Sequence, residues 1–142
     1  MIKKIGIING PNFNVLGKRE PLLYGTTSFD AYLKELEKEF KLSIVISYKQ
    51  SNCEGKIIDY LYEMDQEQEG IILNAGAYSH TSLALSDTLR AIEKPLIEVH
   101  MTNIYAREEK IRHHSFLSAH VKGLILGFGL GSYRLALLSF LA

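Results

Sequence analysis

The chain has 142 residues, which is enough for one domain with a packed hydrophobic core. Its 16 basic and 16 acidic residues cancel, which argues against a nucleic-acid or membrane-surface partner, although a local basic patch is compatible with this balance. The single cysteine, Cys53, excludes an internal disulfide and a cysteine-based zinc site, as suits a reducing cytoplasm. No apolar run approaches the roughly 20 residues of a membrane helix. The N-terminus is expected to enter a strand without a signal peptide.

Strand-like and helix-like segments alternate along the whole chain. Short apolar runs predict buried strands, and apolar residues three or four positions apart predict amphipathic helices. The expected strands are residues 2–9, 42–48, 70–73, 95–99 and 123–126. The expected helices are residues 29–40, 57–65, 85–92, a short polar one at 105–113, and 135–141. This alternation favours an α/β fold, a flavodoxin-like doubly wound parallel sheet of order 2-1-3-4-5, in a single domain of residues 1–142.

A long connection follows the first predicted strand. Such a connection usually takes about 2–6 residues, so one that reaches from residue 9 to residue 25 is either disordered or functional. Apolar residues such as Phe13 and Leu16 argue against disorder, and Gly17 and Gly25 supply hinge points. Because the loop also carries Arg19 and Tyr24, it is expected to be an active-site lid of about residues 10–25.

Polar residues cluster where the strands of the predicted sheet end. The carboxyl ends of neighbouring parallel strands meet at one edge, which is where such sheets bind ligands. The residues expected at this edge are Asn9, Asn12, Asn74, His80, His100 and Thr102, with Arg107 and Arg112 close enough to reach the rim. Glu98 shares a strand face with His100, and it either orients the imidazole or is simply a paired buried carboxylate.

The other histidines, His113, His114 and His120, have no such placement and are expected to be solvated or to lie at helix ends. Two histidines among asparagines make a poor set of metal ligands, so no metal is expected.

Two further sequence patterns are not expected to have a function. The stretch from Gly127 to Gly131 lacks the spacing of a phosphate-binding loop and is expected to be a turn, and Ser79 and Ser82 lack the motif of a hydrolase nucleophile.

Tyr24 has to overcome the weak acidity of a phenol before it can act as a base. A free phenol has a pKa near 10, so acting as a base at neutral pH requires about 3–4 kcal/mol of stabilisation of its anion. A nearby arginine supplies roughly 1–3 pKa units. Arg19, and as a second candidate Arg112, are expected to provide that charge.

Several segments, in order along nearly the whole chain, resemble the type II 3-dehydroquinate dehydratases. The matching segments are residues 9–25, 50–55, 74–82, 97–103, 106–108 and 127–129. The resemblance implies dehydration of 3-dehydroquinate to 3-dehydroshikimate in the shikimate pathway, without a cofactor, by anti elimination through an enolate. It also implies a cytoplasmic homododecamer built as a tetramer of trimers.

The resemblance assigns roles residue by residue. It implies that Tyr24 is the base, His100 the acid, Arg19 the arginine of the lid and Asn12 the holder of a water near the enolate oxygen. The residues it implies for substrate binding are Asn74, His80, Met101, Thr102, Arg112 and, reaching a neighbouring subunit's site, Asp87. The spacing from Arg107 to Arg112 is one residue longer than the family usually has, so Arg107 is the alternative to Arg112.

Other functions of the same fold remain as alternatives. A flavin-phosphate module would have a first loop rich in Ser, Thr and Gly, whereas this loop is built of Asn, Pro and Arg. A phospho-acceptor domain would carry acidic residues where Asn9 and Asn74 stand. A protein that kept the fold for assembly alone would not need the chemical groups named above.

Overall fold

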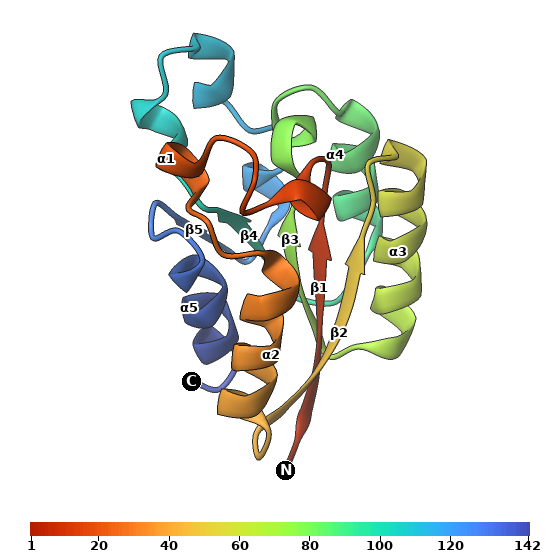
Figure 1. Ribbon diagram of the computed structural model, residues 1–142. Coiled ribbons are helices and arrows are strands. Elements are labelled where there is room, and N and C mark those ends of the chain that lie inside the picture. Colours follow the sequence, from red (N-terminus) through yellow and green to blue (C-terminus); the bar gives the residue numbers. More distant parts are fainter.

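A computed structural model describes all 142 residues as a five-stranded parallel sheet covered by helices on both faces (Figure 1). The strands are β1 (Lys3–Asn9), β2 (Ile44–Gln50), β3 (Gly70–Asn74), β4 (Leu96–His100) and β5 (Gly123–Leu126). The helices are α1 (Pro21–Tyr24), α2 (Phe29–Phe40), α3 (Glu54–Glu67), α4 (Leu83–Ala91) and α5 (Gly131–Ser139). The strand order is β2-β1-β3-β4-β5 and every pairing is parallel, which confirms the predicted fold class.

The central strands are apolar throughout because both of their faces are covered. Side chains alternate between the faces, so Ile72 of β3 packs with α2 and α5, while Ile71 and Leu73 pack with α3 and α4. Figure 1 shows the same division, with α2 and α5 on one side of the sheet and α3 and α4 on the other. The two cores fix the carboxyl ends of β1, β3 and β4 side by side at one edge.

The helix starts follow ordinary capping chemistry. The hydroxyl of Ser28 accepts a hydrogen bond from the backbone N–H of Ala31, and that of Ser82 accepts one from the N–H of Leu85. Each satisfies a donor that the first turn of a helix leaves without a partner.

The local structure differs from the expected elements at several points. Residues 105–113 are not one helix but two 3₁₀ turns, Ile104–Ala106 and Lys110–His113, because the backbone of Arg107 is extended. The loop after β1 contains a 3₁₀ turn, Phe13–Val15, and the short helix α1, which begins at Pro21, a residue whose ring favours the first turn. β2 begins at Ile44 instead of Leu42, since residues 41–43 form the turn that leaves α2.

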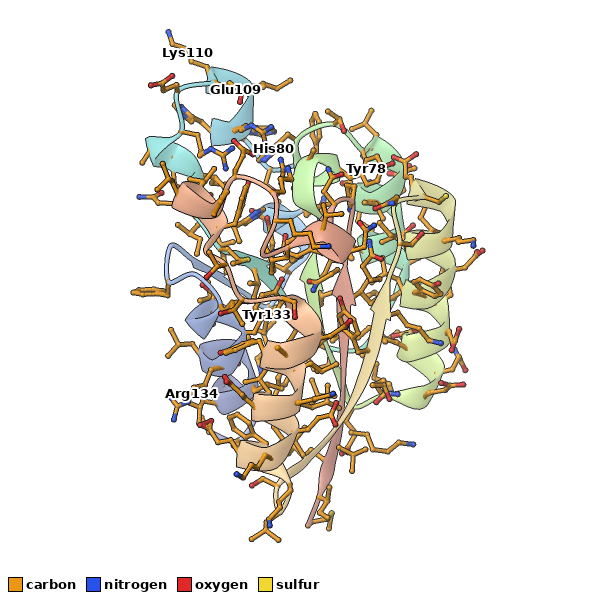
Figure 2. The ribbon with its side chains drawn as sticks, viewed as in Figure 1. Tyr78, His80, Glu109, Lys110, Tyr133 and Arg134 are labelled. Carbon is orange, nitrogen blue, oxygen red and sulfur yellow. The ribbon has the colours of Figure 1, made fainter.

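The remaining 3₁₀ turns are Gly76–His80 and Ser118–His120. No helix has the length and apolar character that crossing a membrane requires. In Figure 2 the labelled side chains of Glu109 and Lys110 mark the turn farthest above the sheet, and His80 lies below them, near the strand ends.

Candidate active site

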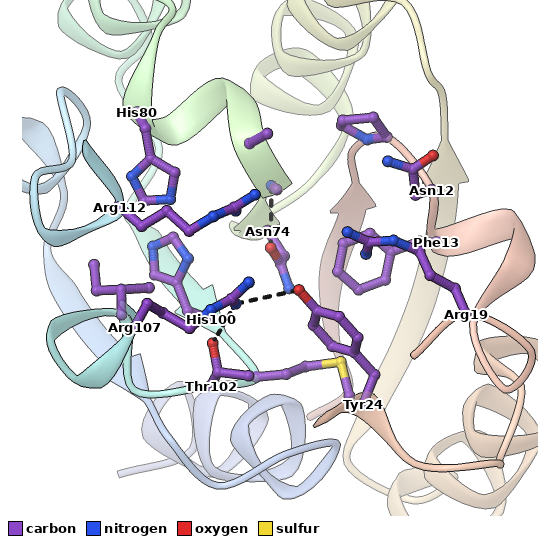
Figure 3. A pocket seen from close by; sticks show the side chains of 15 residues that line it. Asn12, Phe13, Arg19, Tyr24, Asn74, His80, His100, Thr102, Arg107 and Arg112 are labelled. Atoms are coloured by element: carbon purple, nitrogen blue, oxygen red, sulfur yellow. Dashed lines mark hydrogen bonds between the residues drawn. The ribbon is translucent and has the colours of Figure 1, made fainter. Parts of the chain in front are cut away.

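A pocket opens at the carboxyl edge of the sheet, between the loop after β1 and the segments that follow β3 and β4 (Figure 3). Nine of the ten residues predicted for the site line it: Asn12, Arg19, Tyr24, Asn74, His80, His100, Met101, Thr102 and Arg112. Arg107 lines it as well. The tenth residue, Asp87, is exposed on α4 beside Arg90 and Ala91, at a separate shallow surface of the same chain.

The permanently charged side chains that line the pocket are all positive. Arg19, Arg107 and Arg112 all line it, and no Asp or Glu does. Glu109 accepts a hydrogen bond of 2.9 Å from Nε of Arg112, which fixes that side chain while leaving the other guanidinium nitrogens for a ligand. Three guanidinium groups around one cavity favour an anionic ligand, since their donors match a carboxylate.

Tyr24 enters the pocket from the end of α1. Its hydroxyl oxygen accepts a hydrogen bond of 3.2 Å from Nη1 of Arg107, and the same nitrogen lies 3.2 Å from Oγ1 of Thr102. Figure 3 shows the phenol pointing across the cavity toward Arg107. A guanidinium in this position can stabilise negative charge on the phenol oxygen.

Arg19 lies against the face of the Tyr24 ring. Its guanidinium carbon lies 4.9 Å from the centroid of the Tyr24 ring, over the face of the ring, and it pairs with Glu20 at 3.3 Å. The arginine that reaches the phenol oxygen is Arg107, which was expected only as an alternative substrate-binding residue. Arg107 is therefore a second positive charge beside Tyr24, in addition to the expected Arg19.

His100 is held by a buried carboxylate. Its Nε2 lies 2.5 Å from Oε2 of Glu98, whose side chain is fully buried. Burial by itself would raise the pKa of Glu98, but the hydrogen bond and charge of His100, together with the hydroxyls of Ser118 and Ser115, outweigh it and lower that pKa. An ionised carboxylate can only accept, so Nε2 carries a hydrogen and Nδ1 is the nitrogen left for a ligand.

His80 lies beside His100, with the two rings stacked at 6.1 Å between centroids. Nδ1 of His80 is 2.8 Å from the carbonyl oxygen of His114, and a carbonyl only accepts, so Nδ1 carries the hydrogen. Burial lowers the pKa of His80, and the positive charges of His100 and Arg112 act in the same direction. His80 is therefore neutral at pH 7 and presents Nε2 as an acceptor for a hydroxyl group.

Asn74 is fixed by a buried hydrogen-bond network. Its Nδ2 donates to the hydroxyl of Tyr133 at 2.9 Å, and its Oδ1 accepts from the N–H of Gly76 at 3.2 Å. The Tyr133 hydroxyl in turn donates to Oδ1 of Asn9 at 2.6 Å. Complete burial raises the pKa of Tyr133 well above its ordinary value, so this hydroxyl stays a donor. One N–H of Asn74 is left for a ligand.

Backbone contacts shape the two ends of the pocket. Asn12 adopts a left-handed conformation with φ of 74°, and its N–H donates to Oδ1 of Asn52 at 3.0 Å. On the other side, Gly127 and Gly129 donate their N–H groups to the carbonyls of His100 and Met101. The glycine-rich stretch is thus a turn, as predicted, and it supports the end of β4.

No three His, Cys, Asp or Glu side chains gather in a way that would suit a metal ion. The chemical groups that the pocket offers are a phenol beside a guanidinium, an imidazole beside a carboxylate, a second imidazole, and amide and hydroxyl donors. These groups suit a small anion with hydroxyl groups, and they include two separate positions for proton transfer.

The fold and the pocket together define a doubly wound α/β protein with an acid–base site for a small anion. The chain belongs to the class II dehydroquinase family, since the model of the family described as "Dehydroquinase class II" matches residues 3–141. A 3-dehydroquinate dehydratase of Rhizobium johnstonii is 46% identical over 142 residues, with 96% of this chain and 94% of the relative covered. One from Gloeothece citriformis is 48% identical over 134 residues, with 94% and 88% covered.

Solved structures agree with these sequence relatives. The type II dehydroquinase of Propionibacterium acnes superposes with a TM-score of 0.91 at 40% identity, covering 99% of this chain and 97% of that one. The type II dehydroquinase of Butyrivibrio crossotus gives a TM-score of 0.94 at 37% identity, with 99% of each chain covered.

The sequence did not predict three contributors to the pocket. They are the contact of Arg107 with Tyr24, the carbonyl of His114, and the network of Tyr133 with Asn9. His113 was also underestimated, because its Nε2 donates to the carbonyl of Arg107 at 2.5 Å and so fixes the backbone that carries this arginine. Asn9 had been expected at the strand ends, whereas its partner Tyr133 had not.

The stability of the protein should depend on pH through His80. Its pKa in the folded state is below the ordinary value of 6.5, so in the interval between them the unfolded chain binds a proton that the folded chain does not. Stability conferred by neutral His80 is therefore lost as the pH falls below about 6.5. We expect the stability advantage of the wild type over His80→Asn to shrink between about pH 7.5 and pH 5, as measured by urea unfolding. A pH-independent difference would contradict the assignment.

Proposed function

We propose that this protein dehydrates 3-dehydroquinate to 3-dehydroshikimate, in line with the name 3-dehydroquinate dehydratase that its relatives carry. The observation that carries the proposal is the arrangement of two proton-transfer groups in one pocket, Tyr24 with Arg107 and His100 with Glu98. The substrate is an anion with hydroxyl groups and a ketone, which fits a pocket of three arginines, amides and imidazoles. The step belongs to the shikimate pathway.

The first step is removal of a proton from C2 of the substrate. Tyr24 takes this proton as the phenolate, and the electron pair of the C–H bond moves toward the C3 ketone, which becomes an enolate oxygen. Arg107 and Arg19 stabilise the phenolate, the first through its hydrogen bond to the oxygen and the second from over the ring. Asn12 holds a water that donates to the enolate oxygen, because a proton beside a ketone is only weakly acidic without such support.

The second step expels the C1 hydroxyl. The enolate re-forms the ketone, the new double bond forms between C1 and C2, and the C1–O bond breaks as His100, protonated on both ring nitrogens for this step, donates the proton from Nδ1 and keeps the one on Nε2. The products are the unsaturated keto acid and water. His80, Asn74, Thr102, Met101 and Arg112 bind the hydroxyls and the carboxylate, with His80 accepting through Nε2.

Residues 10–25 act as a lid on a single catalytic domain that spans residues 1–142. Gly17 and Gly25 adopt φ values of 98° and 82°, which only glycine tolerates well, and they bracket the segment that carries Arg19 and Tyr24. Movement at these two points would bring Arg19 against bound substrate and exclude water, strengthening each electrostatic contact.

We further propose that the protein works in the cytoplasm as a homododecamer, a tetramer of trimers. Asp87 lies outside the pocket of its own chain and shares an exposed face of α4 with Leu83, four residues earlier. An acidic side chain beside an exposed leucine suits contact with a second copy, whose site Asp87 would then reach.

Replacement of Tyr24 by Phe tests the proposed reaction most simply. The absorbance of the enone product reports turnover of 3-dehydroquinate. We expect Tyr24→Phe to lower kcat at least about 1,000-fold, since removal of a general base typically costs about 100- to 10,000-fold. The melting temperature should be unchanged. Tyr62→Phe, which alters an exposed tyrosine on α3, is the matched control and should behave as wild type. Full activity of Tyr24→Phe would refute the assignment of the base.

Replacement of Arg107 by Gln tests the contact that sequence reasoning missed. A hydrogen bond to a charged group contributes about 1.5–3 kcal/mol, so kcat should fall about 10- to 100-fold. If Arg107 serves the phenolate, kcat changes more than KM, and the opposite pattern would make it a substrate-binding residue only. Steady-state kinetics of Arg107→Gln, compared with Arg107→Lys, which retains the positive charge, distinguishes a role toward the phenolate from a role in substrate binding only.

A further inference from the structure

Residues 114–118 form a segment that supports both histidines of the pocket from behind. The carbonyl of His114 accepts from Nδ1 of His80 at 2.8 Å, and the hydroxyls of Ser115 and Ser118 donate to Glu98. The segment is anchored by Leu117, whose side chain is fully buried in the core beneath α3 and α4. The segment is also linked to the turn that carries His80, because the N–H of Phe116 donates a hydrogen bond to the carbonyl of Ser79.

The two serines complete the coordination of a buried carboxylate. Oε1 of Glu98 accepts from the hydroxyl of Ser118 at 2.7 Å, and Oε2 accepts from the hydroxyl of Ser115 at 2.8 Å and from His100. A buried carboxylate is costly unless its oxygens have donors, and here both oxygens have one. Neither serine lines the pocket, so both act on a ligand only through Glu98.

This arrangement determines which ring nitrogen of His100 faces the substrate. A hydroxyl group beside a carboxylate donates, so Ser118 fixes Oε1 and leaves Oε2 directed at His100. As long as Glu98 is ionised and held this way, Nε2 of His100 carries a hydrogen. Nδ1 is then the nitrogen that gains and loses a proton in the pocket. A carboxylate free to rotate or to take up a proton would allow the other tautomer.

We propose that Ser115 and Ser118 are positioning residues for the elimination step. They hold ionised Glu98 in the orientation that keeps the hydrogen on Nε2 of His100 and leaves Nδ1 to deliver the proton to the departing hydroxyl. This inference rests on the proposed function for its kinetic consequence. The consequence for the tautomer of His100 does not depend on any reaction.

Ser118 gives the cleaner test of the two. Its hydroxyl contacts only Glu98, whereas the hydroxyl of Ser115 also accepts from the N–H of Leu117 at 3.1 Å and so shapes the segment itself. Ser118→Ala removes the donor, and Ser118→Thr keeps it. Ser139→Ala is the control, because that hydroxyl donates to a backbone carbonyl of α5, far from the site.

The experiment measures kcat, KM and the ¹⁵N signals of the His100 ring in the free enzyme, assigned by their absence from His100→Gln. We expect Ser118→Ala to lower kcat at least about tenfold with KM nearly unchanged, from loss of a hydrogen bond to a charged group. Its ring signals should shift from the Nε2–H form toward a mixture, while Ser118→Thr and Ser139→Ala match the wild type. If Ser118→Ala does not fold, Ser118→Cys, which keeps the volume and weakens the donor, takes its place under the same criteria.

Wild-type kcat in Ser118→Ala, or a loss shared equally by Ser118→Thr, would overturn the proposal and leave Ser118 a purely structural residue. Unchanged ring signals in Ser118→Ala would also overturn it, whatever the kinetics. An inactive wild-type enzyme would refute the proposed function instead, and the ring signals would then still decide whether the two serines set the tautomer.

Discussion

The hydrogen bond between the fully buried carboxylate of Glu98 and Nε2 of His100 is the interaction on which the rest of the site depends. It places an anion behind the strand edge, while three arginines line the pocket in front of it. The site is thus electrically divided, with negative charge behind His100 and positive charge around the phenol of Tyr24. In the proposed mechanism, this division lets one pocket hold an acid and a base of opposite charge without their neutralising each other.

The sheet makes that division possible. Glu98 and His100 are two residues apart on β4, so both side chains lie on one face, and neighbouring β3 brings Asn74 and the His80 turn alongside. Helix α5 contributes through Tyr133, which is labelled in Figure 2. The hydroxyl of Tyr133 donates to Oδ1 of Asn9 and accepts from Nδ2 of Asn74. The two hydrophobic cores therefore position the residues that line the pocket, and a substitution in either core is expected to displace the groups that hold the ligand.

Most of the fold and most of the residues that line the pocket could be predicted from the sequence, for physical reasons. Strands buried on both faces leave continuous apolar runs, so the strand order followed from alternation with helices. The pocket residues at the strand ends could be predicted because the carboxyl ends of neighbouring parallel strands meet at one edge of the sheet. The role of Arg107 could not be predicted, because it and Tyr24 lie 83 positions apart and meet only through tertiary packing. The false helix at 105–113 arose because local pattern cannot register the hydrogen bond from His113 back to Arg107. No sequence pattern predicts that the hydroxyls of Ser115 and Ser118 contact Glu98.

The central claim is that Tyr24 and His100 act on different bonds of one substrate, the first on the C2 proton and the second on the C1 hydroxyl. The most direct measurement follows exchange of the C2 proton of 3-dehydroquinate with deuterium from the solvent, by NMR, in His100→Ala and in Tyr24→Phe. The account predicts that His100→Ala exchanges one C2 proton without forming product, and that Tyr24→Phe does neither. Exchange in Tyr24→Phe, with none in His100→Ala, would contradict it.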